Sequence, residues 1–356
     1  MSNPTKPAHQ KISFVTAKDG TRIAVARMGK GPTILKAGNW LSHATHDGES
    51  PIWRHWLQEL SRDHQFIRYD LRGCGLSDRD VEDISFDAWL SDLEAVADII
   101  DGPVTLLGLS QGCALSIAFA LRHPKKVERL ILIGSYAQGM LARGDATNAQ
   151  LEADTLANLV RLGWGKEVQA FNQVFTHLFV PSGTPEQHSW WRRLERESAS
   201  PEIALRTLEI LHKIDVLADA AKLDVPALIF HANDDARIPF DEGRKLAAVI
   251  AGAQFVALDT ANHILLENEP AWEVFLKTFR AFLPETRTHR PIRAAYHLTN
   301  AEEDVVALVA KGMGNHEIAA TLRKSEKTVR NQITVALGKV GVRSRSELIV
   351  KVLSDG

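Results

Sequence analysis

Ser110 lies in a sequence pattern typical of a serine nucleophile. It is the central residue of Gly108-Leu109-Ser110-Gln111-Gly112, which fits the pattern G-x-S-x-G. An apolar segment, 104–109, precedes the motif, and a segment rich in small residues, 113–122, follows it. This context predicts a strand, a sharp turn and a helix, an arrangement that exposes a serine hydroxyl above a sheet. The glycines are needed because the strained, closely packed turn leaves no room for side chains.

A serine hydroxyl is too weakly acidic to attack a carbonyl unaided, so it needs a base and a carboxylate that orients the base. The apolar segment 227–232 leads to Asp235, and the apolar segment 254–258 leads to His263. The order Ser110, Asp235, His263 is the chain order of α/β-hydrolases. We therefore predict that the Ser110 hydroxyl lies within hydrogen-bond reach of His263, whose other ring nitrogen faces Asp235.

These residues stand within a regular alternation of expected strands and helices. Short apolar segments that end in Gly, Asp, Ser or His are typical of buried strands in a parallel sheet. Strands are expected at 12–15, 21–27, 33–36, 66–69, 104–109, 130–134, 227–230 and 254–258, the first two as a hairpin. Helices are expected at 53–61, 86–100, 113–122, 242–250 and 271–282. The alternation predicts an α/β fold with a doubly wound, mostly parallel sheet, whose ligand sites lie at the carboxyl ends of the strands.

One interruption of this alternation is too long for a plain crossover. About ninety residues, 137–226, separate two expected strands, far more than a connection needs. The segment is helical in pattern and rich in aromatic residues, so we predict an inserted helical cap.

The chain divides into an acidic body and a small basic tail. The segment 284–296, PETRTHRPIRAAY, carries two prolines and no apolar periodicity, as a linker would. We predict a body at 1–284, a linker at 285–297 and a tail domain at 298–356. The body holds 30 Lys and Arg against 36 Asp and Glu, whereas residues 285–356 hold 12 against 8. This asymmetry raises nucleic acid as a partner for the tail alone.

Several classes of protein are excluded by composition. No segment approaches the ~20 apolar residues of a membrane helix, and the N-terminus lacks the apolar core of a secretory signal. The two cysteines, Cys74 and Cys113, make a poor disulfide framework, so we expect a reduced, cytoplasmic protein with no membrane partner. Neither metal-ligand spacing nor a phosphate loop nor a dinucleotide fingerprint occurs, so we expect no metal and no cofactor.

The tail is expected to form four short helices, and the second and third form a helix-turn-helix. The expected bounds are 299–311, 315–322, 326–340 and 344–353. On the third helix, apolar residues fall on one side, and the opposite side is polar: Lys327, Thr328, Arg330, Asn331 and Thr334. A polar face of this kind fits either a DNA major groove or plain solvent, and periodicity alone does not choose between them.

Residues 12–283 resemble an α/β-hydrolase. The resemblance includes Asp70-Leu71-Arg72-Gly73-Cys74-Gly75-Leu76-Ser77 after the fourth strand and Asp235-x-x-Ile238-Pro239 near the acid. It implies that Ser110 is the nucleophile, Asp235 the acid and His263 the base. Many relatives carry His-Gly in the first oxyanion loop, where this chain has Lys36-Ala37-Gly38-Asn39-Trp40. We expect one oxyanion donor from the backbone of Gln111 and the other from Asn39 or Trp40.

The tail resembles the LuxR/GerE-type DNA-binding domain over about sixty residues. The matching positions are Leu298-Thr299-x-x-Glu302, Gly312-x-x-Asn315-x-Glu317-Ile318-Ala319, Ser325-x-Lys327-Thr328-Val329-Arg330-Asn331 and Lys339-Val340-Gly341-Val342-x-Ser344-Arg345. Ala301, Lys324 and Gln332 depart from the pattern. The resemblance implies that the polar face of the third helix reads DNA. Relatives bind inverted repeats as dimers, so we expect a homodimer joined through Leu348, Ile349 and Leu353.

The combination resembles bacterial regulators in which the body is the sensor. We expect a DNA-binding transcriptional regulator whose capped pocket senses, and in one form of the hypothesis hydrolyses, a small apolar ester, lactone or acyl compound. Two alternatives use the same triad: a working serine esterase that the tail only localises or dimerises, and a carbon-carbon bond hydrolase.

Overall fold

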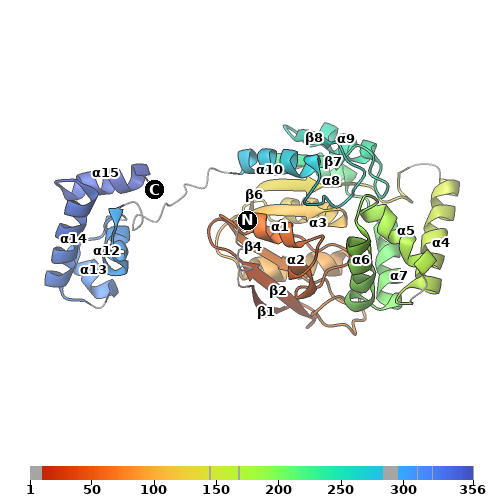
Figure 1. The fold of residues 1–356 in the computed structure, drawn as a ribbon, viewed down its shortest axis with the longest axis horizontal. Helices are drawn as coiled ribbons and strands as arrows, with labels where there is room; N and C mark the ends of the chain where they lie inside the picture. The colour runs from red at the N-terminus through yellow and green to blue at the C-terminus, as the bar shows by residue number, and fades with distance from the viewer. Residues whose placement is uncertain are drawn as a thin grey trace. The chain divides into compact units, whose positions relative to one another are not determined.

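The computed structural model describes residues 10–143, 146–166, 169–283, 296–310, 312–322 and 324–355. It divides into two compact units, Met1–Leu283 and Pro284–Gly356, which are treated separately below (Figure 1). The predicted linker falls mostly outside the described residues.

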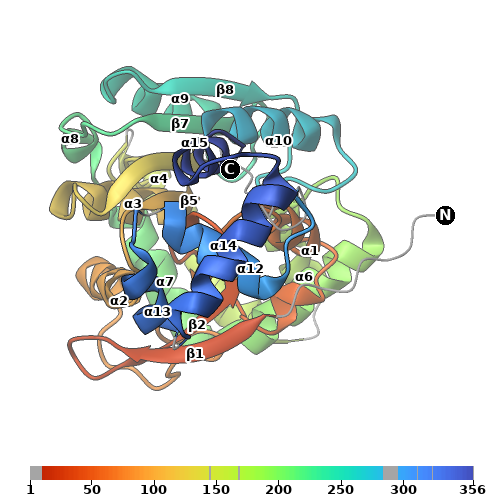
Figure 2. The same ribbon diagram turned by 90° about the vertical axis from the view of Figure 1, so that its left-hand side faces the viewer.

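The first unit is built on one eight-stranded sheet, with the order β1-β2-β4-β3-β5-β6-β7-β8. Figure 2 shows β1 at one edge and β8 at the other. The bounds are β1 Lys11–Thr16, β2 Arg22–Met28, β3 Thr33–Lys36, β4 Gln65–Tyr69, β5 Val104–Leu109, β6 Val127–Ile133, β7 Ala227–Ala232 and β8 Gln254–Leu258. β2 pairs antiparallel with β1 and β4, and the other pairings are parallel. All residues of β5 and β7 are buried, as expected for strands covered on both faces.

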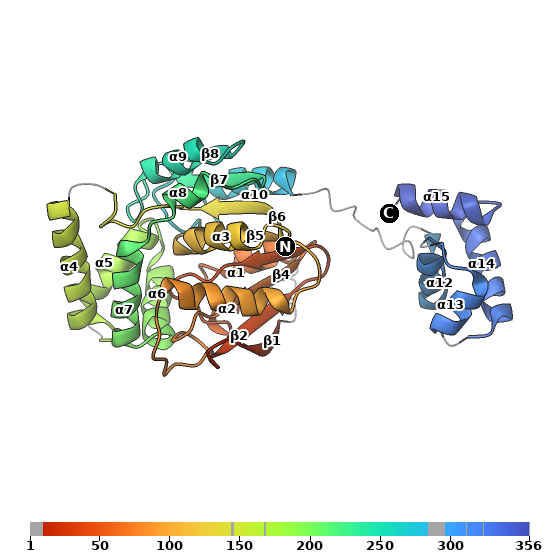
Figure 3. The same ribbon diagram turned by 180° about the vertical axis from the view of Figure 1, so that it is seen from behind.

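Helices cover both faces of the sheet. One face carries α1 (Arg54–Leu60) and α10 (Pro270–Phe282), joined by Trp56, which lies 4.8 Å from Trp272 and 4.9 Å from Phe275 between ring centroids. In Figure 3, α2 (Phe86–Asp98), α3 (Gln111–Arg122) and α8 (Leu217–Ala220) lie in front of the other face, with α9 (Phe240–Val249) nearby. The predicted α/β fold is therefore confirmed.

Between β6 and β7 the chain forms a helical insertion. It contains α4 (Ala146–Gly163), α5 (Gln169–Phe179), α6 (Pro185–Ser198) and α7 (Pro201–Lys213), grouped at one end of the unit in Figure 1, and then α8. Thr184 and Gln187 form a reciprocal capping box at the start of α6, and Ser200 caps α7. These local signals begin two of the helices that we call the cap.

The second unit is a small helical domain with its own core. It contains α12 (Asn300–Ala310), α13 (Asn315–Leu322), α14 (Glu326–Val340) and α15 (Arg345–Asp355). Ser325 accepts a hydrogen bond from the backbone of Thr328 at the start of α14, and Gly341, with φ of +75°, ends it. No helix within the described ranges is long and apolar enough to cross a membrane.

Candidate active site and candidate DNA interface

Ser110 occupies a strained turn between β5 and α3. Its backbone has φ of +55° and ψ of −123°, a region that residues with side chains rarely adopt. A Cβ atom on Gly108 would lie 2.6 Å from the Cα of Cys113, and one on Gly112 would lie 3.1 Å from the carbonyl oxygen of Gly38. These close approaches explain both glycines of the motif, and the turn presents Ser110 at the carboxyl edge of the sheet.

Asp235 and His263 form a buried pair. Nδ1 of His263 lies 2.7 Å from Oδ2 of Asp235, and both side chains are fully buried. The second carboxylate oxygen, Oδ1, accepts hydrogen bonds from the backbone N–H groups of Arg237, at 2.8 Å, and Ile238, at 2.9 Å. Burial alone would raise the pKa of Asp235, but the charge and hydrogen bond of His263 and the N–H of Ile238 outweigh it and lower this pKa. Asp235 is therefore held as a carboxylate that orients the imidazole.

The structure places Ser110 and His263 near the same strand end. The backbone N–H of Ser110 donates to the carbonyl of Ile133 at 2.9 Å, and the next residue, Gly134, lies directly against the His263 ring. Nε2 of His263 is buried and has no hydrogen-bond partner among the described residues. The predicted Asp–His contact is thus present, whereas the predicted Ser–His hydrogen bond is not formed in this structure. Such a contact often tightens only when a ligand binds.

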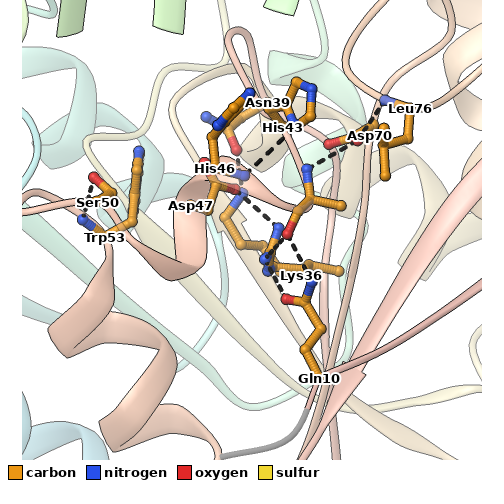
Figure 4. Close-up of polar contacts among 12 residues, drawn as sticks. Gln10, Lys36, Asn39, His43, His46, Asp47, Ser50, Trp53, Asp70 and Leu76 are labelled. Carbon is orange, nitrogen blue, oxygen red and sulfur yellow. Dashed lines mark hydrogen bonds and ion pairs between the residues drawn. The ribbon is translucent and has the colours of Figure 1, made fainter. Parts of the chain in front are cut away.

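The segment 37–41, which we call the oxyanion loop, follows β3. Nζ of Lys36 donates to Oδ1 of Asn39 (Figure 4). Nδ2 of Asn39 donates to the carbonyl of Trp40 at 3.1 Å. These two bonds hold the Asn39 amide against Lys36 and the Trp40 carbonyl, so the backbone N–H groups of the loop are the oxyanion donors that we favour. Gln111 is the first residue of α3, so its backbone N–H has no acceptor within the helix.

A buried polar network supports the chain that follows this loop, as Figure 4 shows. Oδ2 of Asp70 accepts from the backbone N–H groups of Ala44, at 3.0 Å, and Leu76, at 2.9 Å. Arg68 donates to Oδ2 of Asp47 at 2.9 Å and to the carbonyl of Ala44 at 2.8 Å. No sequence pattern predicted this network, since its members belong to separate segments of the chain.

Aromatic residues of the cap pack over the oxyanion loop and the base. Trp40 stacks on Trp164 with 5.5 Å between ring centroids, and Phe179 meets the His263 ring edge-on at 5.5 Å. Phe179 also stacks on Trp191 at 4.8 Å. The cap therefore covers the oxyanion loop and the candidate base with buried aromatic rings.

The cap is also bonded to both neighbours of the candidate base. The backbone N–H of Ile264 donates to the carbonyl of Phe179 at 3.1 Å, and the backbone N–H of Ser182 donates to Oδ1 of Asn262 at 3.0 Å. Nδ2 of Asn262 donates to Glu269, beside the start of α10, at 3.0 Å. Asn262 thus joins the cap to the body next to His263.

Neither the two cysteines nor the possible metal ligands add a second candidate site among the described residues. Cys74 and Cys113 are free and buried, and burial raises the pKa of the Cys113 thiol, so neither resembles an activated nucleophile. No group of His, Cys, Asp and Glu side chains that could hold a metal ion occurs in the described parts of the chain.

The polar face of α14 is open to solvent. Its exposed residues are the five expected DNA contacts, Lys327, Thr328, Arg330, Asn331 and Thr334. Its opposite face, Val329, Ile333, Ala336 and Val340, is buried in the tail core. A two-sided helix of this kind can enter a major groove while its apolar side stays packed.

The expectation that α15 forms the dimer contact is wrong for Leu348. Leu348 is 0% exposed and belongs to the core of the tail unit with Val305 and Val306. Ile349 is half-buried, and the side chain of Leu353 lies outside the described residues. The apolar periodicity of this helix therefore reflects packing inside the unit, whereas Val350, at 67%, is its exposed apolar residue.

Comparison with known families accounts for both units. The family described as alpha/beta hydrolase fold matches residues 45–270, and the bacterial regulatory proteins of the luxR family match residues 296–352. The chain belongs to the α/β hydrolase fold family, and its tail is a luxR-family domain. The tail indicates a DNA-binding regulator and the body an esterase-like domain.

Individual relatives cover the body. The chain is 25% identical over 264 residues to pimeloyl-[acyl-carrier protein] methyl ester esterase of Nitrosomonas europaea, covering 73% of this chain and 98% of the relative. It is 23% identical over 261 residues to pyrrolizixenacetamide deacetylase of Xenorhabdus hominickii, covering 70% and 91%. The enol-lactonase of Burkholderia xenovorans is similar in structure, with a TM-score of 0.62 and 22% identity over 76% of this chain and 99% of that one. At that identity, the structural likeness shows the fold alone.

Proposed function

We propose that the protein is a transcriptional regulator whose hydrolase body binds a small, largely apolar ester, lactone or acyl compound and whose tail binds DNA. The proposal rests on the presence of two features in one chain. The body holds a hydrolase-type Asp235–His263 pair beneath an aromatic cap, and the tail exposes a polar helix, α14, suited to DNA. Because DNA is its proposed partner, we expect the protein to act in the bacterial cytoplasm. We expect a homodimer that binds an inverted repeat, as a two-fold protein would.

The chemistry proposed for the body is acyl transfer. Oγ of Ser110 attacks the carbonyl carbon, His263 accepts the hydroxyl proton on Nε2, and Asp235 holds the resulting imidazolium. The N–H of Gln111 and one from the oxyanion loop stabilise the oxyanion. His263 then returns the proton to the departing alcohol, which leaves an ester on Ser110. Water hydrolyses that ester in a second step with His263 as base.

The test of the regulator uses its DNA site. Operator DNA selected from a random pool is titrated by fluorescence anisotropy, with and without candidate esters and lactones, at one salt concentration. An operator affinity that changes with one of these compounds supports the proposal. Specific DNA binding with no response to any compound that occupies the pocket rejects the sensing role.

The second candidate is a working serine esterase or a carbon-carbon bond hydrolase with a tail that only localises it. The strained turn at Ser110 favours this candidate, since such strain is typical of a hydrolase nucleophile. Labelling by a fluorophosphonate, lost in Ser110→Ala, would demonstrate an activated serine. Turnover of model esters with no influence of ligand on DNA binding would favour the esterase over the regulator.

A further inference from the structure

Lys36 is a half-buried lysine at the base of the oxyanion loop. It is the last residue of β3, and its ammonium group donates to the side chain of Asn39 (Figure 4). The Asn39 side chain in turn donates to the carbonyl of Trp40. One amide therefore connects the lysine to the part of the loop expected to face an oxyanion. The loop ends at Leu41, whose φ of +62° is rare for a residue with a side chain. A strained segment of this kind persists only when its surroundings hold it.

Lys36 lines a small cavity whose walls are mostly apolar. The cavity, of about 20 Å³, has room for about one water molecule. Polar atoms of its lining have no hydrogen-bond partner among the described residues: Oγ of Ser42, Oδ1 of Asp47, Nε1 of Trp53 and Nε of Arg68. Of these four atoms, Oγ of Ser42 and Oδ1 of Asp47 can accept a hydrogen bond, so the cavity wall offers two acceptors suited to an ammonium group.

The charged groups around Lys36 come from three other elements. Asp47, in the 3-10 turn His46–Gly48, and Asp70, which follows β4, favour its charged form. Arg68 of β4 opposes that form, and the Cys113 thiol of α3 weakly favours it. Burial is the largest influence and lowers the pKa of Lys36 to about 8. The amine is therefore mostly charged at pH 7, at a cost in folding free energy.

We propose that Lys36 is a positioning residue that clamps the oxyanion loop through Asn39, so that a backbone N–H of the loop points at the developing oxyanion. A lysine kept only for packing would gain nothing from its charge. Here the charge strengthens the one hydrogen bond that ties the strand to the loop. The effect on reaction rate rests on the proposed serine chemistry, whereas the effect on the loop does not.

The clamp implies a definite pH dependence. Raising the pH through about 8 removes the proton from Lys36 and weakens the charge-assisted bond to Asn39. The rate of serine labelling should therefore fall above pH 8. Because burial disfavours the ammonium form, removing it should leave folding stability at pH 7 equal to or above that of wild type.

The test compares Lys36→Met with wild type across pH 6 to 9.5. Two readouts are taken: the rate of fluorophosphonate labelling at Ser110, and hydrogen-deuterium exchange of the peptide that covers 37–41, corrected for intrinsic rates. We expect about tenfold slower labelling in Lys36→Met at pH 7, since a misaligned oxyanion donor loses part of its effect. We expect faster loop exchange in the same variant, no fall in labelling above pH 8, and an unfolding temperature no lower than that of wild type.

Lys30→Met is the matched control, because Lys30 is an exposed lysine just before β3. It should behave as wild type. Asn39→Leu removes the acceptor and should reproduce the loop exchange and the flat pH profile of Lys36→Met, which keeps the test decisive if Lys36→Met folds poorly.

The two readouts separate this inference from the proposed function. Unchanged loop exchange and an unchanged pH profile in both clamp variants would overturn the role of Lys36. Wild-type protein that no fluorophosphonate labels would instead overturn the serine chemistry, and loop exchange would still decide whether Lys36 holds the loop.

Discussion

The two candidate sites of this chain are built in opposite ways. The body gathers Ser110, Asp235 and His263 from three separate strand ends and buries the Asp–His pair completely. The tail places its expected DNA contacts on one helix, α14, and leaves them exposed. Buried charges interact strongly with their neighbours, whereas exposed charges are screened by salt. The body site should therefore respond to pH and to single buried contacts, and the tail site to salt.

Among variants that test this difference between the two sites, Asp235→Asn should have the largest effect. The amide cannot hold the imidazole in the required tautomer or stabilise its charge, so labelling and ester turnover should fall by about 10⁴. Operator affinity without ligand should not change. Asp234→Asn makes the same chemical change on the exposed neighbour and should leave turnover near wild type. Asp235→Asn with near-normal turnover would break the account of the body site.

The Asp235→Asn variant should also differ from wild type in how its free energy of unfolding changes at acid pH. The folded-state pKa of Asp235 is lowered, so its carboxylate stabilises the fold above its ordinary pKa of about 3.9, and this stability is lost as the pH falls through the lowered value. The variant lacks that contribution, so its free energy of unfolding should fall less steeply below about pH 4. Urea titrations of both proteins between pH 2.5 and 6 measure this. Parallel pH dependences would contradict it.

An intermediate effect is expected from Lys327→Ala combined with Arg330→Ala. Each lost base contact costs about 1–3 kcal/mol, and each lost phosphate contact flattens the salt dependence by about one unit. Anisotropy titrations between 50 and 300 mM salt would show which kind each residue makes, with turnover unchanged. Lys125→Ala, which removes an exposed lysine of the body, is the control. Equal DNA binding by the double variant and wild type would remove α14 from the interface.

The smallest effect is expected from Asn262→Ala, which tests the junction between cap and body. The variant loses the bonds to Ser182 and Glu269, each worth about 1 kcal/mol, and frees the chain beside His263. We expect a lower unfolding temperature and a few-fold lower turnover, measured by calorimetry and ester hydrolysis. Asn233→Ala, an exposed asparagine after β7, should alter neither. Turnover that matches wild type despite the lost stability would show that the junction does not position the base.

The sequence predicted those parts of both sites that depend on local order. The strand, turn and helix around Ser110 and the helices of the tail depend on neighbouring residues, so local patterns predict them. The parts that escaped prediction depend on contacts between distant segments. No periodic sequence pattern indicates the ion pair of Arg68 with Asp47 or the hydrogen bond from Lys36 to Asn39.

The burial of Leu348 shows a related limit. Apolar spacing on α15 indicates that one face is covered, but it does not tell whether the same unit or a partner covers it. The partner contact was expected from resemblance, and the structure assigns this side chain to the core of its own unit.

We propose that the ligand site of the body and the DNA site of the tail are coupled. Coupling is measured as operator affinity at fixed salt, with and without a saturating body ligand, for wild type and Ser110→Ala, together with ligand affinity with and without operator. We expect ligand to change operator affinity by about 5- to 150-fold, and operator to change ligand affinity by the same factor in the non-hydrolysing variant. Operator affinity that saturating ligand leaves unchanged in both proteins would show that the two sites are not coupled.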